Sequence, residues 1–428
     1  MLNLQLPVIF YDMSNFHEID ERQVLYNLHN LRQLVFEVTD SCNLKCKYCG
    51  YAELYQGYDE REGKTLSFAK AKQVIDYLVS LWREVYSPGL NYVLAVSFYG
   101  GEPLMNMPFI KKTIDYLKQI KDTGKCFSYG MTTNAMLLDK YMDYLVEKEF
   151  RLLISLDGDE YAHSYRVSRA GKNSFNRVFR NVKMLQDRYP EYFRKFVMFN
   201  AVLHNRNGLE SIYRFIKDNF GKTPTISPLN HSGIRKDKIN EFRAMYQNPM
   251  QSLFLSKNCE ALESELFIKT PRVYNLSRHI HRHSGNVFGH YNDLLTDDSK
   301  NDFPPTGTCL PFSKKMFITV NGKILPCERI DHDFFYGTVY DDRMELDCKK
   351  VAEQHNDYVF KYVDQCRSCA ITRQCHCVYQ DDNIRKENAN CHEFCDQQKF
   401  EEMTALNFDF LREYPHYYER VLNEVHVR

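Results

Sequence analysis

The sequence predicts an α/β fold in which a parallel sheet is covered by crossover helices. The first observation is a rhythm of apolar strands and amphipathic helices that repeats about every 25–40 residues. The second is that cysteine-, glycine- and aspartate-containing motifs directly follow several strands, where parallel folds gather their active residues. Six strand–helix units make a partial barrel, open enough for a bulky substrate. The expected strands are residues 31–38, 93–98, 127–133, 152–156, 196–203 and 223–227.

The elements can be assigned in chain order from their apolar spacing. The first strand, Leu31–Val38, leads straight into a cysteine-rich loop, and Ser67 is expected to cap the helix that follows a polar stretch. Cys126 lies at the start of the third strand when that strand is extended to 126–133, and it is expected to be buried. Residues 232–305 break the rhythm, with one helix expected over 235–247. The other expected helices are residues 67–86, 108–121, 138–148, 174–188 and 209–219.

Composition restricts the class of protein. Lys plus Arg and Asp plus Glu are both 56, so the zero formal charge argues against bulk nucleic-acid binding and membrane-surface attraction. No run of about 18 apolar residues predicts a membrane span, and the start does not resemble a signal peptide. Fourteen clustered cysteines in such a chain indicate metal ligands rather than disulfides. A reducing, cytoplasmic location is therefore expected.

Three thiols lie close together in the loop Cys42–Cys49, at CxxxCxxC spacing. Thiolates select zinc, Cu(I) or iron–sulfur clusters, so the metal stays open at this point. A closed zinc site needs four protein ligands. Three ligands with no fourth nearby leave an open corner, which suits an iron–sulfur cluster that binds a small molecule at one iron.

The loop resembles the signature of the radical S-adenosylmethionine (SAM) enzymes. This resemblance implies that Cys42, Cys46 and Cys49 hold a [4Fe-4S] cluster and that SAM binds its fourth iron. A GGEP motif about fifty residues later is explained equally well by a tight turn, but the resemblance implies that it binds the SAM amino group. The family often has Thr-Asn-Gly at the end of the third strand, and this chain differs there by having Ala135 in place of the glycine. By the same resemblance the expected SAM-binding residues are Tyr48, Gly100, Gly101, Glu102, Ser155, Arg166 and Leu229.

The carboxyl-terminal region changes character, with nine cysteines among residues 309–395 and a hairpin signal at Asn321-Gly322. CxxC pairs allow two thiolates to reach one metal. Spacing alone fits either two four-iron clusters or a double zinc ribbon. The cysteines are Cys309, Cys327, Cys348, Cys366, Cys369, Cys375, Cys377, Cys391 and Cys395.

This arrangement resembles the SPASM domain, which follows a radical SAM barrel of partial TIM-like (β/α)6 type and carries two auxiliary [4Fe-4S] clusters. The resemblance assigns Cys309, Cys327 and Cys377 to the first cluster, with Cys348 as the candidate fourth ligand. It assigns Cys366, Cys369 and Cys375 to the second, with either Cys391 or Cys395. The SPASM pattern has three residues between its fifth and sixth cysteines. In this chain only His376 separates the corresponding Cys375 and Cys377. In sulfatase-maturing relatives an aspartate is the proposed base at the position of Glu328.

These resemblances imply an oxidoreductase with three [4Fe-4S] clusters and SAM. The expected reaction is reductive SAM cleavage to a 5′-deoxyadenosyl radical and hydrogen abstraction from a ribosomally made precursor peptide, giving a thioether or carbon–carbon crosslink. Formylglycine formation in a sulfatase is the alternative, and a zinc-binding scaffold is the non-enzyme alternative. Expected partners are the peptide, a flavodoxin or ferredoxin, and a separate leader-binding protein, with no nucleic acid or membrane. The expected segments are 1–30, a radical SAM barrel over 31–231, a connection over 232–305, SPASM over 306–396 and helices over 397–428.

Overall fold

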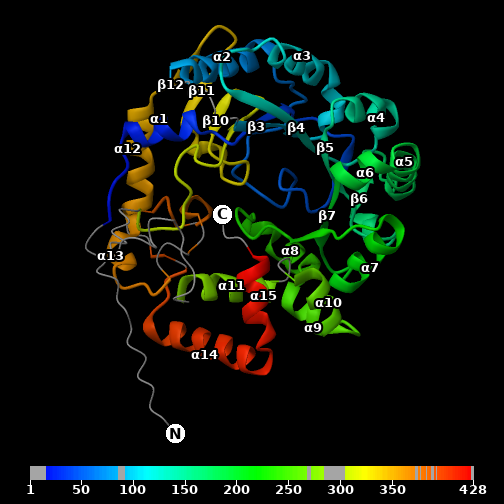
Figure 1. The fold of residues 1–428 in the computed structure, drawn as a ribbon, viewed down its shortest axis with the longest axis vertical. Helices are drawn as coiled ribbons and strands as arrows, with labels where there is room; N and C mark the ends of the chain where they lie inside the picture. The colour runs from blue at the N-terminus through cyan, green and yellow to red at the C-terminus, as the bar shows by residue number, and fades with distance from the viewer. Residues whose placement is uncertain are drawn as a thin grey trace. The chain divides into compact units, whose positions relative to one another are not determined.

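The structure is a computed structural model, drawn in Figure 1. It describes residues 16–84, 92–267, 271–283, 304–371, 375, 377–381, 383–386, 390–391 and 393–425. Two compact units are distinguished. One consists of residues 21–270 and 310–351, and the other of residues 1–20, 271–309 and 352–428.

The first unit is built on a curved parallel sheet, as the sequence predicts. Six strands pair in parallel in the order in which they occur, and the helices between them lie on the outside of the curve (Figure 1). The predicted α/β partial barrel is therefore confirmed. Its strands are β1 (Gln33–Thr39), β3 (Tyr92–Gly100), β4 (Lys125–Thr133), β5 (Arg151–Ser155), β7 (Val197–Leu203) and β8 (Thr225–Pro228).

The crossover helices fall close to their predicted positions. Ser67 accepts a hydrogen bond from the Lys70 backbone N–H at 3.2 Å, which is the predicted cap of α2. The helix expected over 108–121 ends earlier, at Leu117. The covering helices are α2 (Phe68–Glu84), α3 (Met107–Leu117), α4 (Leu138–Glu147), α5 (Phe175–Arg188), α6 (Pro190–Phe196) and α7 (Leu209–Phe220).

The predicted hairpin at Asn321-Gly322 joins the barrel sheet instead of standing apart. Strand β9 (Lys315–Ile318) pairs in parallel with β1, and β10 (Lys323–Leu325) returns antiparallel to it. Gly322 has φ +90°, and a Cβ atom there would lie 2.2 Å from the Val339 carbonyl oxygen, so only glycine fits. Two further antiparallel strands, β11 (Gly337–Val339) and β12 (Met344–Leu346), complete a ten-stranded sheet.

The remaining helices are divided between the two compact units. In the barrel unit lie α1 (Glu21–His29), α8 (Ile239–Met245), α9 (Pro249–Phe254) and α10 (Cys259–Leu266). Helix α12 (Cys348–Val359) begins in the barrel unit and ends in the other. The second unit also contains α11 (Pro271–His283), α13 (Val363–Cys366), α14 (Gln397–Glu413) and α15 (His416–Glu424), the last two within the segment 397–428 where helices are predicted.

Two local features differ from the sequence prediction. Cys126 is exposed on β4, so the expectation of a buried thiol is wrong: the strand turns this side chain outward. The sequence also missed a small antiparallel pair, β2 (Leu44–Cys46) with β6 (Arg166–Ser168). Strands of three residues carry too little periodicity to be recognised.

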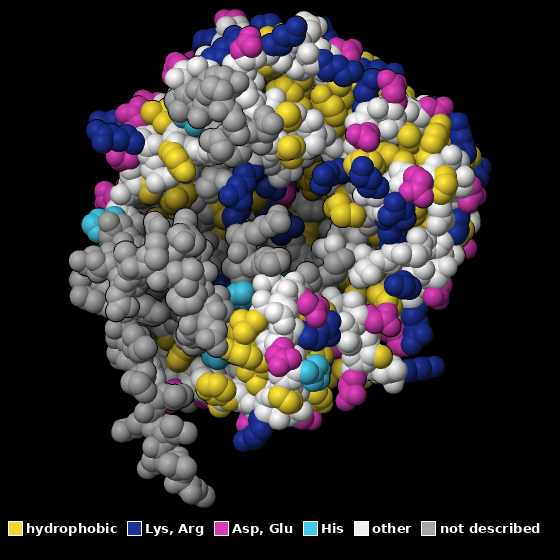
Figure 2. Space-filling view, in the orientation of Figure 1, with side chains coloured by type: hydrophobic (Ala, Val, Ile, Leu, Met, Phe, Trp, Pro, Cys, Tyr) yellow, Lys and Arg dark blue, Asp and Glu magenta, His cyan; other side chains and the backbone are white. Residues whose placement is uncertain are grey.

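The distribution of charged side chains and the apolar length of the helices can be examined directly. On the face drawn in Figure 2, Lys and Arg side chains are interspersed with Asp and Glu side chains, in keeping with zero formal charge. Among the described residues, no helix is long and apolar enough to cross a bilayer.

The alternation along β7 allows a direct test of the barrel core. Phe199 is fully buried and stacks on Phe220 with ring centroids 4.8 Å apart, whereas its neighbour Met198 is 54% exposed. We expect Phe199→Ala to lower the free energy of unfolding by about 3–5 kcal/mol because it leaves a cavity. Met198→Ala, the control on the opposite face, should change it by less than about 1 kcal/mol. Urea unfolding of both variants measures this, and similar losses would contradict the orientation of the strand.

Candidate active site

The cysteine loop lies at the carboxyl end of β1. Cys42 follows the strand by three residues, and Cys46 lies on β2, where its backbone pairs with that of Arg166 on β6. The Cys49 backbone N–H donates to the Cys46 carbonyl at 3.2 Å, which closes a turn. The loop is therefore held by backbone contacts on two sides, and the three predicted ligands belong to one small structural element.

Burial dominates the chemistry of these thiols. It raises the pKa of Cys42 to about 11 and that of Cys46 to about 12. The charge of Cys49 also raises the pKa of both thiols, and the charge of Cys42 raises that of Cys46. Three thiolates brought together in a buried site need a cationic centre to compensate them, and loading that centre releases protons. Across the described ranges, no three Cys, His, Asp or Glu side chains converge on one ion. A cluster whose cysteines bind separate irons does not need such convergence, so the donor set fits it.

Two glycines bring the end of β3 into contact with the loop. A Cβ atom on Gly100, which has φ +129°, would lie 2.2 Å from the Thr39 carbonyl oxygen, and one on Gly101 would lie 2.0 Å from that of Ser41. The Gly101 and Glu102 backbone N–H groups donate to the same two oxygens at 2.8 and 2.9 Å. The close approach that these glycines permit is thus first of all an approach to the backbone of the cysteine loop.

Glu102 connects the ends of β3 and β4 beneath that contact. Its buried carboxylate accepts hydrogen bonds from the Leu104 N–H at 3.2 Å, the Thr133 hydroxyl at 2.6 Å and the Asn134 N–H at 2.8 Å. Burial outweighs these bonds and raises the pKa of Glu102 to about 7. A carboxylate has about four acceptor positions, so one remains for a further donor. The predicted contact with the SAM amino group stays a prediction.

A buried ion pair lies on the other side of the loop. Arg166 donates from Nε and Nη2 to the two carboxylate oxygens of Asp157 at 2.9 and 3.0 Å. The Val202 N–H on β7 donates to the same carboxylate at 2.9 Å, and so does the Tyr48 hydroxyl from the cysteine loop. Burial alone would raise the pKa of Asp157, but the Arg166 charge and its hydrogen bonds hold that pKa well below its usual value of 3.8.

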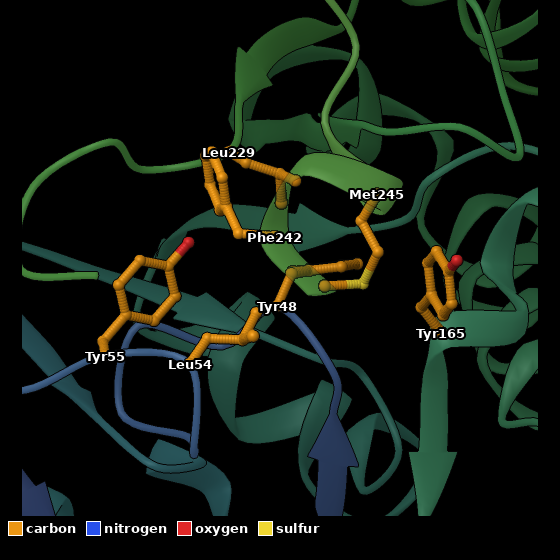
Figure 3. Packing of buried hydrophobic residues seen from close by; sticks show 7 residues of the cluster. All are labelled: Tyr48, Leu54, Tyr55, Tyr165, Leu229, Phe242 and Met245. Carbon is orange, nitrogen blue, oxygen red and sulfur yellow. The ribbon is translucent and has the colours of Figure 1, made fainter. Parts of the chain in front are cut away.

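Tyr48, which is predicted to lie beside SAM, therefore also has a structural role through its hydrogen bond to Asp157. Its ring is 7% exposed and belongs to a buried cluster with Tyr165 and Leu229, shown in Figure 3 together with the other members Leu54, Tyr55, Phe242 and Met245. The Tyr48 and Tyr165 rings meet edge to face at 6.3 Å. Leu229, expected to pack on adenine, is 2% exposed within this cluster. The structure thus brings three predicted SAM-binding residues, Tyr48, Arg166 and Leu229, to one part of the barrel.

Glu328, the predicted base, is ion-paired. Both carboxylate oxygens accept hydrogen bonds from the Lys315 ammonium, at 3.0 and 2.9 Å. Burial opposes ionisation, but the Lys315 charge outweighs it and holds the pKa of Glu328 below its usual value. A carboxylate held in this way is ionised near neutral pH but is a weak proton acceptor. Its predicted role as a base remains a prediction.

A small cavity of about 20 Å³ lies within the second unit and is lined by five of the predicted auxiliary ligands, namely Cys366, Cys369, Cys375, Cys377 and Cys391. The Gly307 backbone N–H donates to the Cys375 sulfur at 3.2 Å. Cys395 is buried beside this group, where its own backbone N–H donates to the Cys369 sulfur at 3.5 Å, but its side chain does not line the cavity. Cys377, expected at the first cluster, therefore lies on the same cavity as the three residues expected at the second.

The other candidate auxiliary ligands occupy separate surroundings. Cys309 is exposed in the second unit, whereas Cys327 and Cys348 belong to the barrel unit. Burial raises the pKa of Cys327 to about 11, with Glu328 beside it. Cys348 begins α12 and lies 3.9 Å from the Tyr77 hydroxyl on α2. No contact on the described part of the barrel unit joins Cys327 to Cys348.

Comparison with known families identifies the barrel. Residues 36–218 match the radical SAM superfamily. This stretch is a radical SAM domain. It contains the cysteine loop, both glycines and the Asp157–Arg166 pair, so the resemblance predicted from CxxxCxxC is confirmed.

The curated relatives that match the radical SAM domain have several different activities. A cysteine-type anaerobic sulfatase-maturating enzyme of Clostridium novyi is 26% identical over 210 residues, which cover 47% of this chain and 53% of that protein. The radical SAM cyclopropyl synthase TigE of Paramaledivibacter caminithermalis is 24% identical over 203 residues, covering 45% and 40%. The chain thus spans about half the length of these curated relatives.

Similarity of fold extends beyond the radical SAM domain. The structure titled native anSMEcpe with bound AdoMet matches with a TM-score of 0.61 and 18% identity, covering 92% of this chain and 100% of that one. The structure of the same protein with AdoMet and the Cp18Cys peptide matches with a TM-score of 0.60 and 17% identity, covering 92% and 99%. The match includes the cysteine-rich region, in agreement with a SPASM-like domain after the barrel.

The sequence places two further residues of this site, Asp157 and Asn134, at strand ends, where the carboxyl ends of parallel strands meet at one edge. It assigned neither of them a partner. Apart from Arg166, which is nine residues from Asp157, the partners described above come from distant parts of the chain, so those contacts were not predictable.

The Asp157–Arg166 pair predicts a pH-dependent stability. Asp157→Asn leaves Arg166 buried without its counter-charge, and we expect it to lower the free energy of unfolding at pH 7 by about 3–5 kcal/mol. The native pKa of Asp157 is lowered, so its stabilisation is complete above the unfolded pKa of about 4 and is lost as pH falls below it. The difference between wild type and variant should therefore shrink from pH 7 to pH 3, as measured by urea midpoints.

The matched control for this prediction is Asp143→Asn. Asp143 and Arg188 form a pair of similar length, 3.0 Å, but both side chains are about half exposed or more. An exposed pair contributes about 0–1 kcal/mol. Equal losses in the two variants, or a wild-type advantage that grows toward acid, would contradict the role given to the buried pair.

Proposed function

We propose that this protein is a radical SAM enzyme that modifies a peptide. The observation that carries the proposal is the cysteine loop. Its three thiols follow the carboxyl end of β1 and lie beside the Asp157–Arg166 pair and the Tyr48 cluster. When bound, the [4Fe-4S] cluster and SAM supply an electron and a 5′-deoxyadenosyl radical that abstracts hydrogen from an unactivated carbon.

The residues around the loop have distinct tasks in this proposal. Cys42, Cys46 and Cys49 hold the cluster. The free acceptor position on Glu102 and the backbone at Gly100 and Gly101 bind the SAM amino end. Arg166 orients the carboxylate or ribose, with Ser155 nearby at the end of β5, and the buried cluster around Tyr48 and Leu229 surrounds the adenine and excludes water.

The substrate class rests on the curated relatives and on Glu328. We propose hydrogen abstraction from a precursor peptide that leads to a thioether or carbon–carbon crosslink. The Lys315 pairing supports this choice, because it weakens Glu328 as the base that formylglycine formation would use. Formylglycine formation remains the second candidate, since a relative with that activity is 26% identical over half its length. Tandem mass spectrometry distinguishes them: crosslinking removes two hydrogens, keeps sulfur and leaves two residues joined. Formylglycine formation removes the sulfur of a cysteine, or two hydrogens from a single serine, and leaves an aldehyde on that one residue.

The carboxyl-terminal cysteines fit auxiliary clusters that would accept the spare electron. Four of the cysteines that line the cavity of the second unit are enough for one such cluster. The first auxiliary cluster, as the SPASM resemblance assigns it, would draw on Cys309, Cys327 and Cys377 with Cys348 as the candidate fourth ligand, which makes three clusters with the one at the loop. A flavodoxin or ferredoxin is the proposed electron donor, and a separate protein that binds the peptide leader is compatible with this scheme.

Cleavage of SAM tests the assignment of the loop. We expect the anaerobically reconstituted protein, given SAM and dithionite, to release 5′-deoxyadenosine. Cys46→Ala should abolish the release because the cluster loses one of three ligands. Cys126→Ala, which removes an exposed thiol from β4, is the control and should leave it unchanged. Chromatography of the products measures this, and persistent release from Cys46→Ala would contradict the assignment.

Iron content tests the auxiliary assignment. Cys391 lines the cavity of the second unit and Cys395 does not, so we propose Cys391 as the fourth ligand of the second auxiliary cluster. Cys391→Ala should lower the iron content by about one four-iron cluster, whereas Cys395→Ala should retain it. Colourless protein that binds zinc in place of iron would instead support a zinc-binding scaffold.

A further inference from the structure

The side chain of Asn134, at the end of β4, lies against the first cysteine of the loop. Its amide nitrogen Nδ2 is 3.7 Å from the Cys42 sulfur and 2.7 Å from Oδ1 of Asn43. Asn134 is 7% exposed, so water does not compete strongly for these contacts. The amide therefore presents N–H groups to the part of the loop that is expected to hold iron.

The orientation of this amide follows from its other partners. Oδ1 of Asn134 accepts a hydrogen bond from the Met136 backbone N–H at 3.0 Å. Because the oxygen is occupied in this way, Nδ2 must face Cys42, and an exchange of the two atoms would place two donors together. The hydrogen-bond partners of Asn134 therefore make its Nδ2 a donor to the Cys42 sulfur.

The backbone around Asn134 holds this geometry rigidly. Its own N–H donates to the Glu102 carboxylate at 2.8 Å, and the Ala135 N–H donates to the Thr133 hydroxyl at 3.0 Å. Ala135 has φ +58°, the left-handed conformation that glycine prefers, so alanine adopts here the kind of backbone conformation that suits the glycine of Thr-Asn-Gly. The turn therefore forms at some conformational cost, with Asn134 aimed at the loop.

Cys42 differs from its neighbours in this respect. Its sulfur accepts a second hydrogen bond, from the Leu44 backbone N–H at 3.4 Å. Within the described residues, the sulfurs of Cys46 and Cys49 accept none. Hydrogen bonds to cluster sulfurs stabilise the more negative, reduced state and are one of the means by which a protein sets the potential of an iron–sulfur cluster.

We propose that Asn134 is a positioning and tuning residue that raises the reduction potential of the cluster held by Cys42, Cys46 and Cys49, by donating a hydrogen bond to the Cys42 sulfur. This inference rests on the proposed function. A one-electron donor then reduces the cluster more readily than it would without Asn134. Glu102 contributes indirectly, because its carboxylate holds the Asn134 backbone in place.

The test is a redox titration of the reconstituted full-length protein with dithionite, followed by electron paramagnetic resonance. The loop cluster is assigned as the signal that changes when SAM is added and that is missing in Cys46→Ala. We expect Asn134→Ala to shift its midpoint potential to a more negative value. Asn134→Asp, which keeps the size but replaces the donor by a carboxylate, should shift it further in the same direction.

Asn176→Ala is the control, because this exposed asparagine donates only to Glu160 on the surface and should leave the potential unchanged. Circular dichroism of each variant verifies folding, and the near-isosteric aspartate variant keeps the test decisive if the alanine variant unfolds. An unchanged potential in the folded Asn134 variants, or an equal shift in Asn176→Ala, overturns the proposal. If no signal depends on Cys46, the proposed function itself fails, which is a separate outcome.

Discussion

The buried pair of Asp157 and Arg166 is the interaction on which the geometry of the site depends. Asp157 follows β5, Arg166 begins β6, and the same carboxylate binds the Val202 N–H on β7 and the Tyr48 hydroxyl in the cysteine loop. One negative charge thus joins four segments, of which only those of Asp157 and Arg166 are close in sequence. Burying such a charge is expensive unless hydrogen bonds and a counter-charge satisfy it, and here the carboxylate receives both. The loop cannot leave this position without uncovering that charge.

A second set of contacts holds the loop from the side of β3 and β4. Here the interactions are backbone contacts, made possible by the missing side chains of Gly100 and Gly101, and the Glu102 carboxylate then ties this strand end to Asn134. The two sets reach opposite ends of the loop, Thr39–Cys42 and Cys46–Tyr48. A metal site whose ligands lie on irregular backbone needs such support, because the loop has few hydrogen bonds of its own.

The cysteine-rich region contributes a different kind of order. The cavity of the second unit is lined by five thiols from a stretch whose described residues contain little helix or strand. Under the proposed function, ligation of these thiols would contribute to the folding free energy of this stretch. Residue 379, where the SPASM spacing places a cysteine, is Tyr379, whose buried ring packs edge to face on Tyr358. The cysteine that the pattern expects at position 379 thus occurs at Cys377 instead, and Tyr379 makes an aromatic contact at the expected position.

The sequence alone determined the α/β class, the six parallel strands and the placement of the cysteine loop at a strand end, because apolar period and strand-end motifs are local properties. It also identified Arg166, Tyr48 and Leu229 as neighbours of one site, through a family resemblance. Only the tertiary structure decided that Arg166 pairs with Asp157, that β9 to β12 extend the barrel sheet, that Asn134 faces Cys42, and that Cys377 shares a cavity with Cys366. Each of these depends on which strand ends lie side by side, and that is a long-range property that no window of sequence contains.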